Sequence, residues 1–545
     1  MLSSKDIRSL RHTFRESKGH THFPPASLIA DKTSTAMFTV AGMQPLIPYL
    51  SGQTHPLGDK LHNIQHCIRT NDIEEVGDNS HHTMFFMMGN WSLGSYFKKE
   101  AIWRSREFLT QYLKLDPRKI AVTAYKWDTE VPQDTETATL RAEQWVPSDK
   151  ISFLDANDNR WSPWPVGPCG PCTEMYYWIG ESEYPGPDDN VKADDSKWLE
   201  IWNNVFMEFY RDESGKLTKL EKQNVDTGMG LERITKVLQQ KISPYETDLF
   251  APTIEVLEKL TEKSYAYFLK KDHTTQEIKE ATSMRIVADH MRCAIFLMAE
   301  WLIPSNEGRG YVLRRIVRRM YFHLNELLDE NSKFSDTIKS CKMIIDTIIQ
   351  QYSTRCTILE NKNDTIIKVL EQELTQFAKT IKQGQKILMK MIDDLKETKT
   401  LSGKDIFMLY DTFGFPLELT EELCKSNNIT LDVTGFEAEM EAAKERSRSN
   451  TLKGQHKDTD RSVYVTGVAP TQFIGYESLQ SDSASVLKKI DFEWYTVVIF
   501  DQTPCYATMG WQDHDNGTRI DDDGQTYEIF DVQNYNGVFL HFVRK

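Results

Sequence analysis

A chain of 545 residues with 39% hydrophobic and 27% charged residues is long enough for about three globular domains, at roughly 150 residues each. Its formal net charge of −15 argues against a protein that coats nucleic acid non-specifically, so contact with nucleic acid requires a local basic patch. The chain has no run of about 18 apolar residues and no apolar signal-peptide core, which predicts a cytoplasmic protein that engages no membrane. Eight scattered cysteines form no disulfide framework, and we expect reduced thiols.

The N-terminal part predicts a short helix followed by extended segments. Residues 5–18 have an amphipathic helical pattern, and residues 36–43 (A-M-F-T-V-A-G-M) are typical of a strand. The extended runs 64–69 and 81–94 flank a short charged turn. This arrangement predicts a β-hairpin whose first strand ends at Arg69 and whose turn can close over a ligand.

The stretch V-D-T-G-M-G-L-E-R-I at residues 225–234 predicts a strand that passes close to a ligand before a helix begins. The guanidinium of Arg233 forks onto phosphate oxygens, and the carboxylate of Asp226 can hold an ammonium group. G-x-G alone is a weak signal, however. A strand-to-helix turn with a solvated Glu-Arg pair is the competing interpretation.

Two other patterns suggest metal ligands, but each has a simpler interpretation. Cys169 and Cys172 form a C-x-x-C, yet no second ligand pair follows in register, and the Gly-Pro spacing favours a rigid turn. His62 and His66 form the only H-x-x-x-H, and on a strand this spacing places both rings on one face without a metal. We therefore assign no metal ligands.

From about residue 246 the sequence predicts mainly helices, including residues 283–300 and 355–395. A polar stretch at 447–458 is typical of a linker, and a β-rich region follows it. One helix carries a stripe of guanidinium groups that is typical of contact with a nucleic-acid backbone, with a solvated basic face as the alternative. The stripe consists of Arg314, Arg315, Arg318 and Arg319, with Arg309 just before it.

Ordered matches along nearly the whole chain resemble the alanyl-tRNA synthetases, a family of class II aminoacyl-tRNA synthetases. They include D-K-T-S-T-A-M-F-T-V-A-G-M-Q-P-L, C-I-R-T-N-D-I-E-E-V-G-D, G-N-W-S-L-G-S-Y-F-K, V-D-T-G-M-G-L-E-R, N-R-W-S-P-W-P-V-G-P-C-G-P-C-T-E and P-S-N-E-G-R-G-Y-V-L-R-R. The resemblance implies an α+β fold whose catalytic domain, at 1–245, is an antiparallel β-sheet flanked by helices. It further implies an α-helical tRNA-recognition domain at 246–450, then a linker and an incomplete β-barrel at 451–545. We expect the family's editing and C-terminal domains to be absent.

The activity implied by the resemblance is the ligation of alanine to tRNA(Ala), with L-alanine, ATP and Mg²⁺ as its small-molecule requirements. Arg69 and Arg233 match the catalytic arginines. The matching ATP-binding residues are Arg69, His81, Phe85, Met87, Gly228, Gly230 and Arg233. The matching alanine-binding residues are Trp161, Asn203, Val205, Asp226 and Gly228, of which Val205 limits the side chain to about a methyl group. Taken singly, each of these residues is equally typical of a core, cap or turn position.

The resemblance also implies recognition of the acceptor stem of tRNA(Ala). Asn306 and Asp411 match the residues that read a G·U wobble pair there, and the resemblance adds weight to the arginine stripe as a tRNA contact. We expect no DNA partner, and the sequence leaves monomer and homodimer open. Two other functions remain as alternatives. One is a non-catalytic, tRNA-binding paralogue. The other is a free-standing editing hydrolase, which is nearly excluded because the Cys-x-x-x-His that would complete its zinc ligands is missing.

The sequence departs from the family at several positions. Tryptophan stands where the family usually has glycine at Trp127, Trp145, Trp164, Trp301 and Trp511. Our hypothesis is that the source reads a stop codon as glycine, whereas the translation supplied tryptophan. Phe86 replaces a family glutamate, which puts one nucleotide contact in doubt. The loop after Arg69 is also shorter than in many members.

Overall fold

The computed structural model describes most of the chain, and the statements below concern those residues. These are residues 1–30, 36–71, 73–144, 146–162, 166–265, 274–305, 308–329, 332–353, 355–395, 399–411, 413, 415–442, 465, 468–475, 478, 480, 481, 483–491, 495–505, 517–520, 526–535 and 537–544. The expected linker at 447–458 lies outside them.

The chain forms two compact units. One combines Met1–Leu302 with Arg315–Leu374, and the other combines Ile303–Arg314 with Thr375–Lys545. The first unit therefore contains the large β-sheet together with several of the helices that follow it in sequence. The three domains expected at 1–245, 246–450 and 451–545 stay a prediction, because compactness alone does not define such domains.

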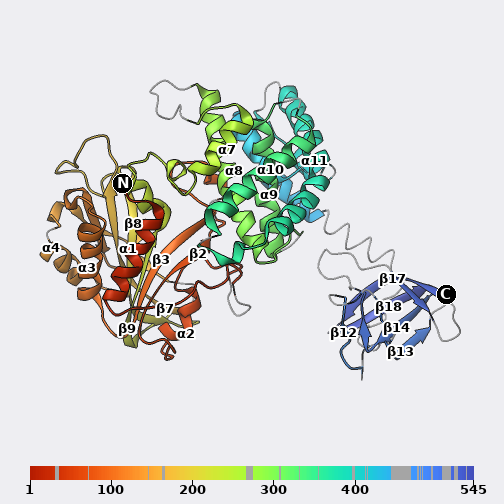
Figure 1. Cartoon of the computed structure of the whole chain (residues 1–545), viewed down its shortest axis with the longest axis horizontal. Coiled ribbons are helices and arrows are strands. Elements are labelled where there is room, and N and C mark those ends of the chain that lie inside the picture. The colour runs from red at the N-terminus through yellow and green to blue at the C-terminus, as the bar shows by residue number, and fades with distance from the viewer. Residues whose placement is uncertain are drawn as a thin grey trace. The chain divides into compact units, whose positions relative to one another are not determined.

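A nine-stranded sheet forms the centre of the first unit (Figure 1). Its order is β1-β2-β3-β9-β8-β7-β4-β5, with β6 paired to β7. The pairs β1/β2 and β4/β5 are parallel and the other pairs are antiparallel, which confirms the predicted α+β class. The bounds are β1 Thr21–His22, β2 Lys60–Ile68, β3 Met84–Leu93, β4 Ile120–Tyr125, β5 Ile151–Leu154, β6 Arg160–Trp161, β7 Gly167–Trp178, β8 Trp198–Arg211 and β9 Leu217–Gly230.

The predicted hairpin is formed by β2 and β3. The two strands pair antiparallel from Lys60↔Ser92 to Ile68↔Met84. Arg69 follows the last paired residue of β2, and its N–H donates to the carbonyl of Thr83 at 2.9 Å. The hairpin was predicted correctly, but its first strand ends at Ile68, one residue before the predicted Arg69, and the connection between the strands runs over residues 69–83.

The strand predicted at residues 36–43 is wrong. This segment contains only one bridge, Ile29↔Phe38, and continues as bends and turns. The side chain of Gln44 supplies hydrogen bonds that a neighbouring strand would otherwise make: its Oε1 accepts from Val40 N at 2.9 Å, and its Nε2 donates to Phe38 O at 3.3 Å. The apolar pattern reflects burial, because Phe38 is only 3% exposed, and not strand pairing.

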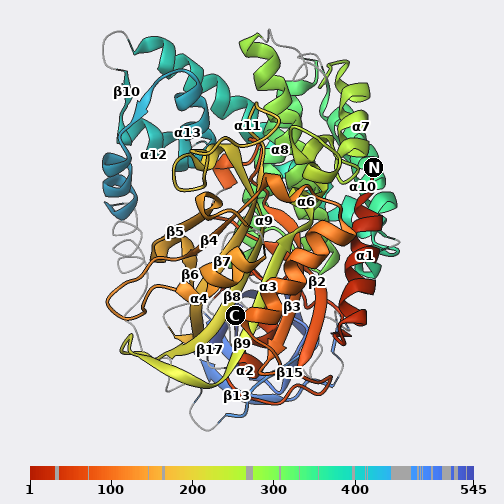
Figure 2. The same ribbon diagram turned by 90° about the vertical axis from the view of Figure 1, so that its left-hand side faces the viewer.

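Helices pack against this sheet (Figure 2). The predicted N-terminal helix is α1, Ser4–Ser17, whose first turn is closed by a capping box between Ser3 and Asp6. Sheet contacts are also made by α3 (Lys98–Glu107), α4 (Thr135–Glu143), α6 (Leu231–Leu238) and α8 (Thr275–Ala299). Helix α6 begins directly after Gly230, so β9 feeds into it without a loop.

The region after residue 246 is mainly helical, as predicted. Its helices include α7 Ala251–Thr261, α9 Gly308–Leu327, α10 Phe334–Tyr352, α11 Asn363–Asp394, α12 Gly403–Asp411 and α13 Leu417–Ser426. Among the described residues, none of the helices combines the length and apolar composition that a bilayer crossing requires.

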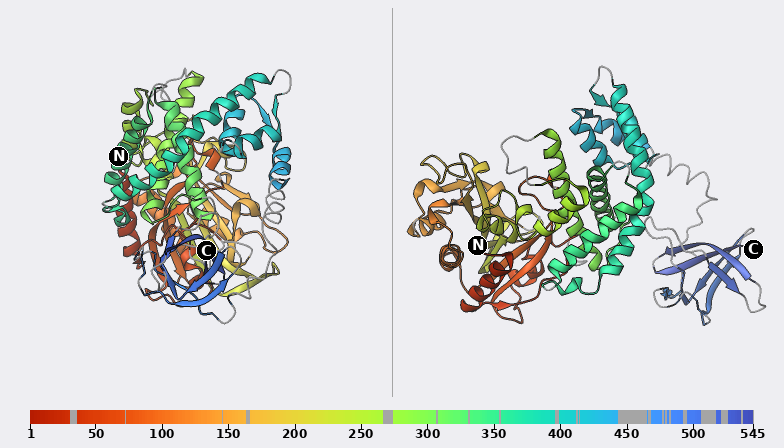
Figure 3. Two further views of the ribbon diagram at one scale, coloured as in Figure 1. Left: turned by 90° about the vertical axis from the view of Figure 1, so that its right-hand side faces the viewer. Right: turned by 45° about the horizontal axis from the view of Figure 1, so that its top comes forward.

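The C-terminal β-region is a five-stranded antiparallel sheet of order β13-β14-β18-β17-β16, drawn in blue in Figure 3. A short parallel pair, β12 (Gln472–Phe473) with β15 (Gln502–Thr503), accompanies it. The sheet strands are β13 Val486–Asp491, β14 Tyr495–Phe500, β16 Gly517–Ile520, β17 Thr526–Tyr535 and β18 Val538–Arg544.

Candidate active site

A cavity of about 420 Å³ lies over the central sheet of the first unit. It is lined by every residue that the sequence assigned to ATP or alanine, from β3, β6, β8, β9, α6 and the β2–β3 connection. These residues are Arg69, His81, Phe85, Met87, Trp161, Asn203, Val205, Asp226, Gly228, Gly230 and Arg233. Segments more than 150 positions apart therefore meet around one space of the size that small-molecule ligands occupy, roughly 300–1,000 Å³.

The two predicted catalytic arginines reach this cavity from different elements. Arg69 follows β2, donates from Nε to Val40 O at 3.3 Å, and places its guanidinium 5.1 Å from the ring centre of Phe85. Arg233 lies in the first turn of α6, and its Nη1 is 2.6 Å from Glu200 Oε2 on β8. Both side chains retain solvent exposure, so phosphate oxygens can reach them.

The alternative of a solvated Glu232–Arg233 pair is wrong. Glu232 is 1% exposed and turns away from Arg233. Its carboxylate accepts from Phe86 N at 3.1 Å and from Arg292 Nη1 at 3.0 Å. Glu232 thus fixes β3 to α6 and α8, whereas Arg233 is directed to the cavity, because successive helical residues face different directions.

The other end of the cavity suits a small ammonium group. Asp226 on β9 is 8% exposed, and burial raises its pKa to about 7. Asn203 on β8 donates from Nδ2 to Glu174 Oε1 at 3.1 Å, whereas its buried amide oxygen accepts no hydrogen bond within the described residues. Val205 pairs with Asp226 across β8 and β9 and is 3% exposed. An acceptor and an acidic group therefore stand beside an apolar wall.

Burial also changes the pKa of the carboxyl group of Glu174 on β7. Burial, and secondly the charge of Glu200, raise the pKa of Glu174 to about 8. Tyr176 donates its hydroxyl to Glu174 Oε2 at 2.7 Å. The sequence reasoning missed Glu174 and Glu200. No predicted site residue lies on β7, and Glu200 is three residues before Asn203, outside the period-two spacing of β8, where the register against β7 shifts.

The two glycines of the G-x-G differ in what they require. A Cβ added at Gly228 would lie 2.9 Å from Met87 Sδ, so the Met87 side chain would have to move. A Cβ at Gly230 would lie 3.7 Å from its nearest neighbour, an ordinary contact with Arg233. Both glycines line the cavity, and the close approach of a ligand to this strand stays a prediction.

Phe86 does not line the cavity, and the doubt about a nucleotide contact at this position stays a prediction. Side chains alternate along β3, and Phe85 and Met87 line the cavity on the opposite face. Phe86 is fully buried and stacks on Tyr352 with ring centroids 5.6 Å apart. The guanidiniums of Arg8 and Arg292 lie 5.5 and 5.6 Å from its ring centre. A missing carboxylate here changes packing behind the sheet and not the ligand-facing surface.

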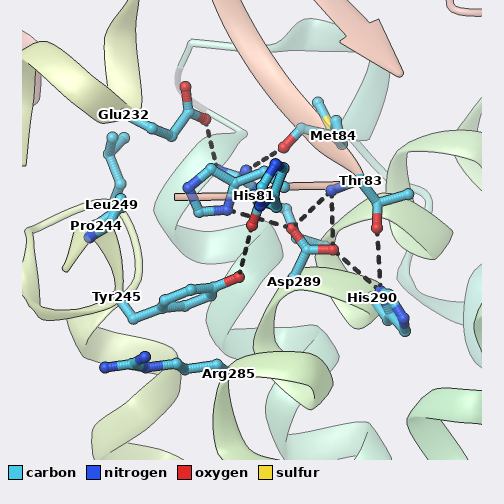
Figure 4. Close-up of polar contacts among 12 residues, drawn as sticks. His81, Thr83, Met84, Glu232, Pro244, Tyr245, Leu249, Arg285, Asp289 and His290 are labelled. Carbon is cyan, nitrogen blue, oxygen red and sulfur yellow. Dashed lines mark hydrogen bonds and ion pairs between the residues drawn. The ribbon is translucent and has the colours of Figure 1, made fainter. Parts of the chain in front are cut away.

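A buried polar network holds the end of the β2–β3 connection to α8 (Figure 4). Asp289 accepts from Thr83 N at 3.1 Å, and His82 Nδ1 lies 3.4 Å from the same oxygen. Tyr245 donates to His81 O at 3.4 Å. Although burial disfavours its charge, hydrogen bonds from His290 and His82 hold the pKa of Asp289 well below its usual range. The network therefore contains a permanent carboxylate, and sequence reasoning missed it.

Arginines of α8 and α9 hold the rest of the same connection. Arg285 donates from Nη1 to Gly77 O at 3.2 Å and to Asn79 Oδ1 at 2.9 Å. Arg319 donates from Nη1 to Ile73 O at 2.9 Å and contacts His290 Nε2 at 3.0 Å. The β2–β3 connection, which supplies His81 to the cavity, is thus anchored along its length by charged donors and acceptors.

The predicted tRNA-contact stripe on α9 does not present one uniform exposed face. Arg319 is 6% exposed, Arg318 Nε donates to Glu373 Oε1 at 3.0 Å, and Arg315 forms an ion pair with Glu74. Arg309 and Arg314 belong to the second compact unit, and each has a partner there or elsewhere in the chain. Asn306 and the side chain of Asp411 lie outside the described residues. The assignment of these seven residues to tRNA stays a prediction.

The C-x-x-C is not a turn, and that prediction is wrong. Both cysteines lie on β7, which continues through them with a register shift between Cys169 and Cys172 against β8. A Cβ at Gly170 would lie 1.9 Å from Phe206 O, so glycine is required where the irregular strand presses on its neighbour. The described residues contain no group of three or more His, Cys, Asp or Glu side chains placed to hold a metal ion.

His62 and His66 lie on β2, as the strand interpretation predicted. His62 lies among imidazoles, with ring centroids 5.2 Å from His12 and 5.3 Å from His22. His66 packs against aromatic rings, and burial lowers the pKa of each of the two β2 histidines to about 3. Both are neutral side chains of the interior.

Two of the five tryptophans at family glycine positions are described. Trp301 has φ = 66° and is 70% exposed, and Trp127 has φ = 159° and is 58% exposed. The first value lies in the left-handed region that favours glycine. Trp145, Trp164 and Trp511 lie outside the described residues.

Comparisons with known proteins agree with this geometry. The sequence model described as "tRNA synthetases class II (A)" matches residues 6–545. The alanine--tRNA ligase of Borrelia hermsii is 40% identical over 448 residues, which cover 81% of this chain and 72% of that protein. The chain belongs to this family. Its class II membership implies that ATP is used.

Other relatives are longer than this chain. The alanine--tRNA ligase of Borreliella afzelii is 41% identical, covering 78% of this chain and 69% of that protein. That of Fusobacterium nucleatum is 36% identical and covers all of this chain but 61% of that protein. The chain thus spans about three fifths of the length of several relatives that it matches along its whole length. A solved S. aureus histidyl-tRNA synthetase has a TM-score of 0.28 at 7% identity over 43% of this chain and 64% of that one, too low to bear on the fold.

Proposed function

We propose that the chain is an alanine–tRNA ligase, which activates L-alanine with ATP and transfers it to the 3′ end of tRNA(Ala). One observation carries this proposal: Arg69, Arg233 and Asp226 line the same cavity over an antiparallel sheet. Two cationic groups for a polyphosphate and one carboxylate for an amine are what adenylation of an amino acid requires. The 36–41% identity to alanine–tRNA ligases supports alanine as that amino acid.

Positioning and charge stabilisation account for the first step. An oxygen of the alanine carboxylate attacks the α-phosphorus of ATP, and the bond to the β-phosphate oxygen breaks, so pyrophosphate leaves. Arg69 holds the α-phosphate and the attacking carboxylate as negative charge gathers there. Arg233 exchanges its bond to Glu200 for the terminal phosphate of a bent ATP. The reactants are thereby held in line, which contributes rate without a covalent enzyme intermediate.

The site binds the ammonium group of alanine and selects alanine by the size of its side chain. Asp226 supplies the charge partner, and the unpaired amide oxygen of Asn203 accepts a second hydrogen bond. Val205 and Trp161 form the wall that the methyl group meets. A pocket of this kind discriminates against glycine or serine by only about 1–3 kcal/mol, so both competitors are activated to a measurable extent.

Mg²⁺ accompanies the nucleotide. It commonly binds through one or two carboxylates together with substrate phosphates, so a dedicated cluster of protein ligands is not required. Glu200 lies beside Arg233 with its carboxylate 32% exposed, which fits one such ligand. When bound, the ion neutralises charge on the phosphates. We propose tRNA(Ala) as the second substrate, whose acceptor stem contacts Asn306, Asp411 and the α9 arginines. We propose that the reaction takes place in the cytoplasm.

Exchange of labelled pyrophosphate into ATP tests this function without tRNA. Alanine, glycine and serine are assayed side by side with the purified chain. We expect strong exchange with alanine and roughly 10- to 200-fold less with the other two, given the 1–3 kcal/mol that such a pocket supplies. A non-catalytic paralogue that only binds tRNA would give no exchange with any amino acid.

A further inference from the structure

A second cavity, of about 1320 Å³, opens beside the first within the same compact unit. The two cavities share Ser80, His81, Glu200 and Arg233 on their linings. The guanidinium proposed to hold the terminal phosphate of ATP therefore stands at the boundary between them. A group released at Arg233 can pass into the second cavity without crossing the alanine end of the first.

The second cavity is lined by a lysine whose ammonium forms no ion pair with the described residues. Lys236 lies on α6, one turn after Arg233, and its residue is only 6% exposed. Its ammonium forms no hydrogen bond with any of the described residues and no ion pair within 4.0 Å, whereas Arg233 is paired with Glu200. The stem of Lys236 is buried while its ammonium, which has no acceptor among the described residues, stands in the cavity wall, and such a cation points to an anionic ligand.

The charges around Lys236 support the same conclusion. Burial is the main cause that lowers the pKa of Lys236; the charge of Glu246 opposes it, the charges of Arg233 and Arg285 lower the pKa further, and that of Asp78 raises it. A bound anion would relieve both burial and repulsion. The remaining cationic lining consists of Lys114, Lys119 and Lys241.

We propose that the second cavity is a binding site for inorganic pyrophosphate, with Arg233 and Lys236 as its cationic residues. This inference rests on the proposed adenylation, in which the electron pair of the broken α-phosphorus–oxygen bond stays with the departing pyrophosphate. The leaving group begins at Arg233, and Lys236 is the next cation along the same helix face, three residues on. Lys236 thus binds the product and, in the reverse reaction, the attacking pyrophosphate.

Equilibrium dialysis with labelled pyrophosphate, in the absence of ATP and alanine, tests this site directly. Lys236→Met removes the charge and keeps most of the side-chain volume, and Lys236→Arg restores a cation. Lys259→Met on the exposed face of α7 is the matched control. We expect Lys236→Met to weaken pyrophosphate binding about tenfold or more, as loss of a charge-assisted contact does, while Lys236→Arg stays within a few-fold of wild type.

The exchange assay supplies a second readout. The KM for pyrophosphate should rise in Lys236→Met by the same factor as the dissociation constant, with the KM for alanine unchanged. Equal binding by Lys236→Met and wild type would overturn the site, as would equal losses in a folded Lys236→Arg and Lys236→Met. Weakened binding of an RNA hairpin ending in CCA, with pyrophosphate unaffected, would also overturn it. Absence of alanine-dependent exchange in wild type would instead reject the proposed function, since dialysis requires no catalysis.

Discussion

Two groups of arginines stand out in this sequence, and the structure treats them differently. Arg69 and Arg233 are 164 positions apart, yet both line one cavity. The stripe on α9 is contiguous, yet Arg315, Arg318 and Arg319 contact carboxylates and carbonyls of the chain itself. Helical spacing tells which side chains share a face, but not what that face meets. Arg69 and Arg233 line one cavity because distant strands pair in the central sheet. Arg319 is buried because the β2–β3 connection packs against it.

The largest effect is expected from the first group. Arg69→Ala and Arg233→Ala should each lower alanine-dependent pyrophosphate exchange by about 10²–10³-fold, because each removes a donor aimed at developing or transferred charge. Initial rates of exchange measure this, with circular dichroism to verify folding. If either folded variant retained wild-type exchange, the contrast between the two arginine groups would disappear.

The variant Arg319→Met tests whether the α9 arginines stabilise the protein itself. This change leaves Ile73 O and His290 Nε2 without their donor inside the protein, which costs about 1–3 kcal/mol of unfolding free energy. We also expect slower exchange in the absence of tRNA, since the connection carrying His81 loses an anchor. Chemical denaturation and exchange rates provide the measurements, with Lys259→Met as control. A residue that only contacts tRNA would leave both quantities unchanged.

The pH dependence of alanine use follows from Asp226. Its pKa of about 7 in the folded protein means that the free enzyme takes up a proton below that pH. The apparent KM for alanine should therefore rise by up to about tenfold for each pH unit below 7 and level off above it. The apparent KM for alanine is measured from exchange kinetics at pH values from about 5.5 to about 8.5, which bracket the pKa. Asp226→Asn should bind alanine weakly at every pH.

The same carboxyl group affects folding with a defined sign. Its folded-state pKa is raised above the ordinary 3.8, so the folded protein binds the proton more tightly than the unfolded chain. The stability that this group contributes is present at low pH and is lost as pH rises from about 4 to about 7. Asp226→Asn should accordingly be more stable than wild type at pH 8. An equally large stabilisation at acidic pH would contradict the raised pKa.

The smallest effect concerns Trp301. Its φ of 66° is unfavourable for a bulky side chain, so Trp301→Gly should raise the unfolding free energy by about 1 kcal/mol. Loss of the contact between its ring and Lys362 Nζ, 3.6 Å away, reduces that gain. Thermal unfolding of both variants gives the comparison. Peptide mass spectrometry of the native protein that found tryptophan here would overturn the codon-reassignment hypothesis.

Sequence reasoning was most successful where a side chain's role follows from local pattern. The hairpin of β2 and β3 and the strand-to-helix step before Arg233 were both predicted from short-range signals. The strand predicted at 36–43 was wrong because the segment makes only scattered backbone hydrogen bonds, to Leu28, Ala30 and Ile68, and two more to the side chain of Gln44. The doubt about a nucleotide contact at Phe86 stays a prediction, although one step along β3 from Phe85 turns the Phe86 side chain to the face away from the cavity.

The parts of the site that the sequence could not reveal depend on distant contacts. Asp289 and Thr83 are 206 positions apart, and nothing in either local segment indicates that they bond. The same holds for Lys236, whose helix position was readable, because only the folded unit shows that its ammonium forms no ion pair with the described residues. Spacing supplies candidate residues, and packing decides which of them are paired, buried or left available for a ligand.

A crystal structure of the chain with alanine and a non-hydrolysable ATP analogue tests the central claim most directly. We predict one bent triphosphate with its α-phosphate oxygens within hydrogen-bond distance of Arg69 and its terminal phosphate bonded to Arg233. Alanine's ammonium should lie against Asp226. A nucleotide seated elsewhere, or one that contacts only one of the two guanidiniums, would contradict the account.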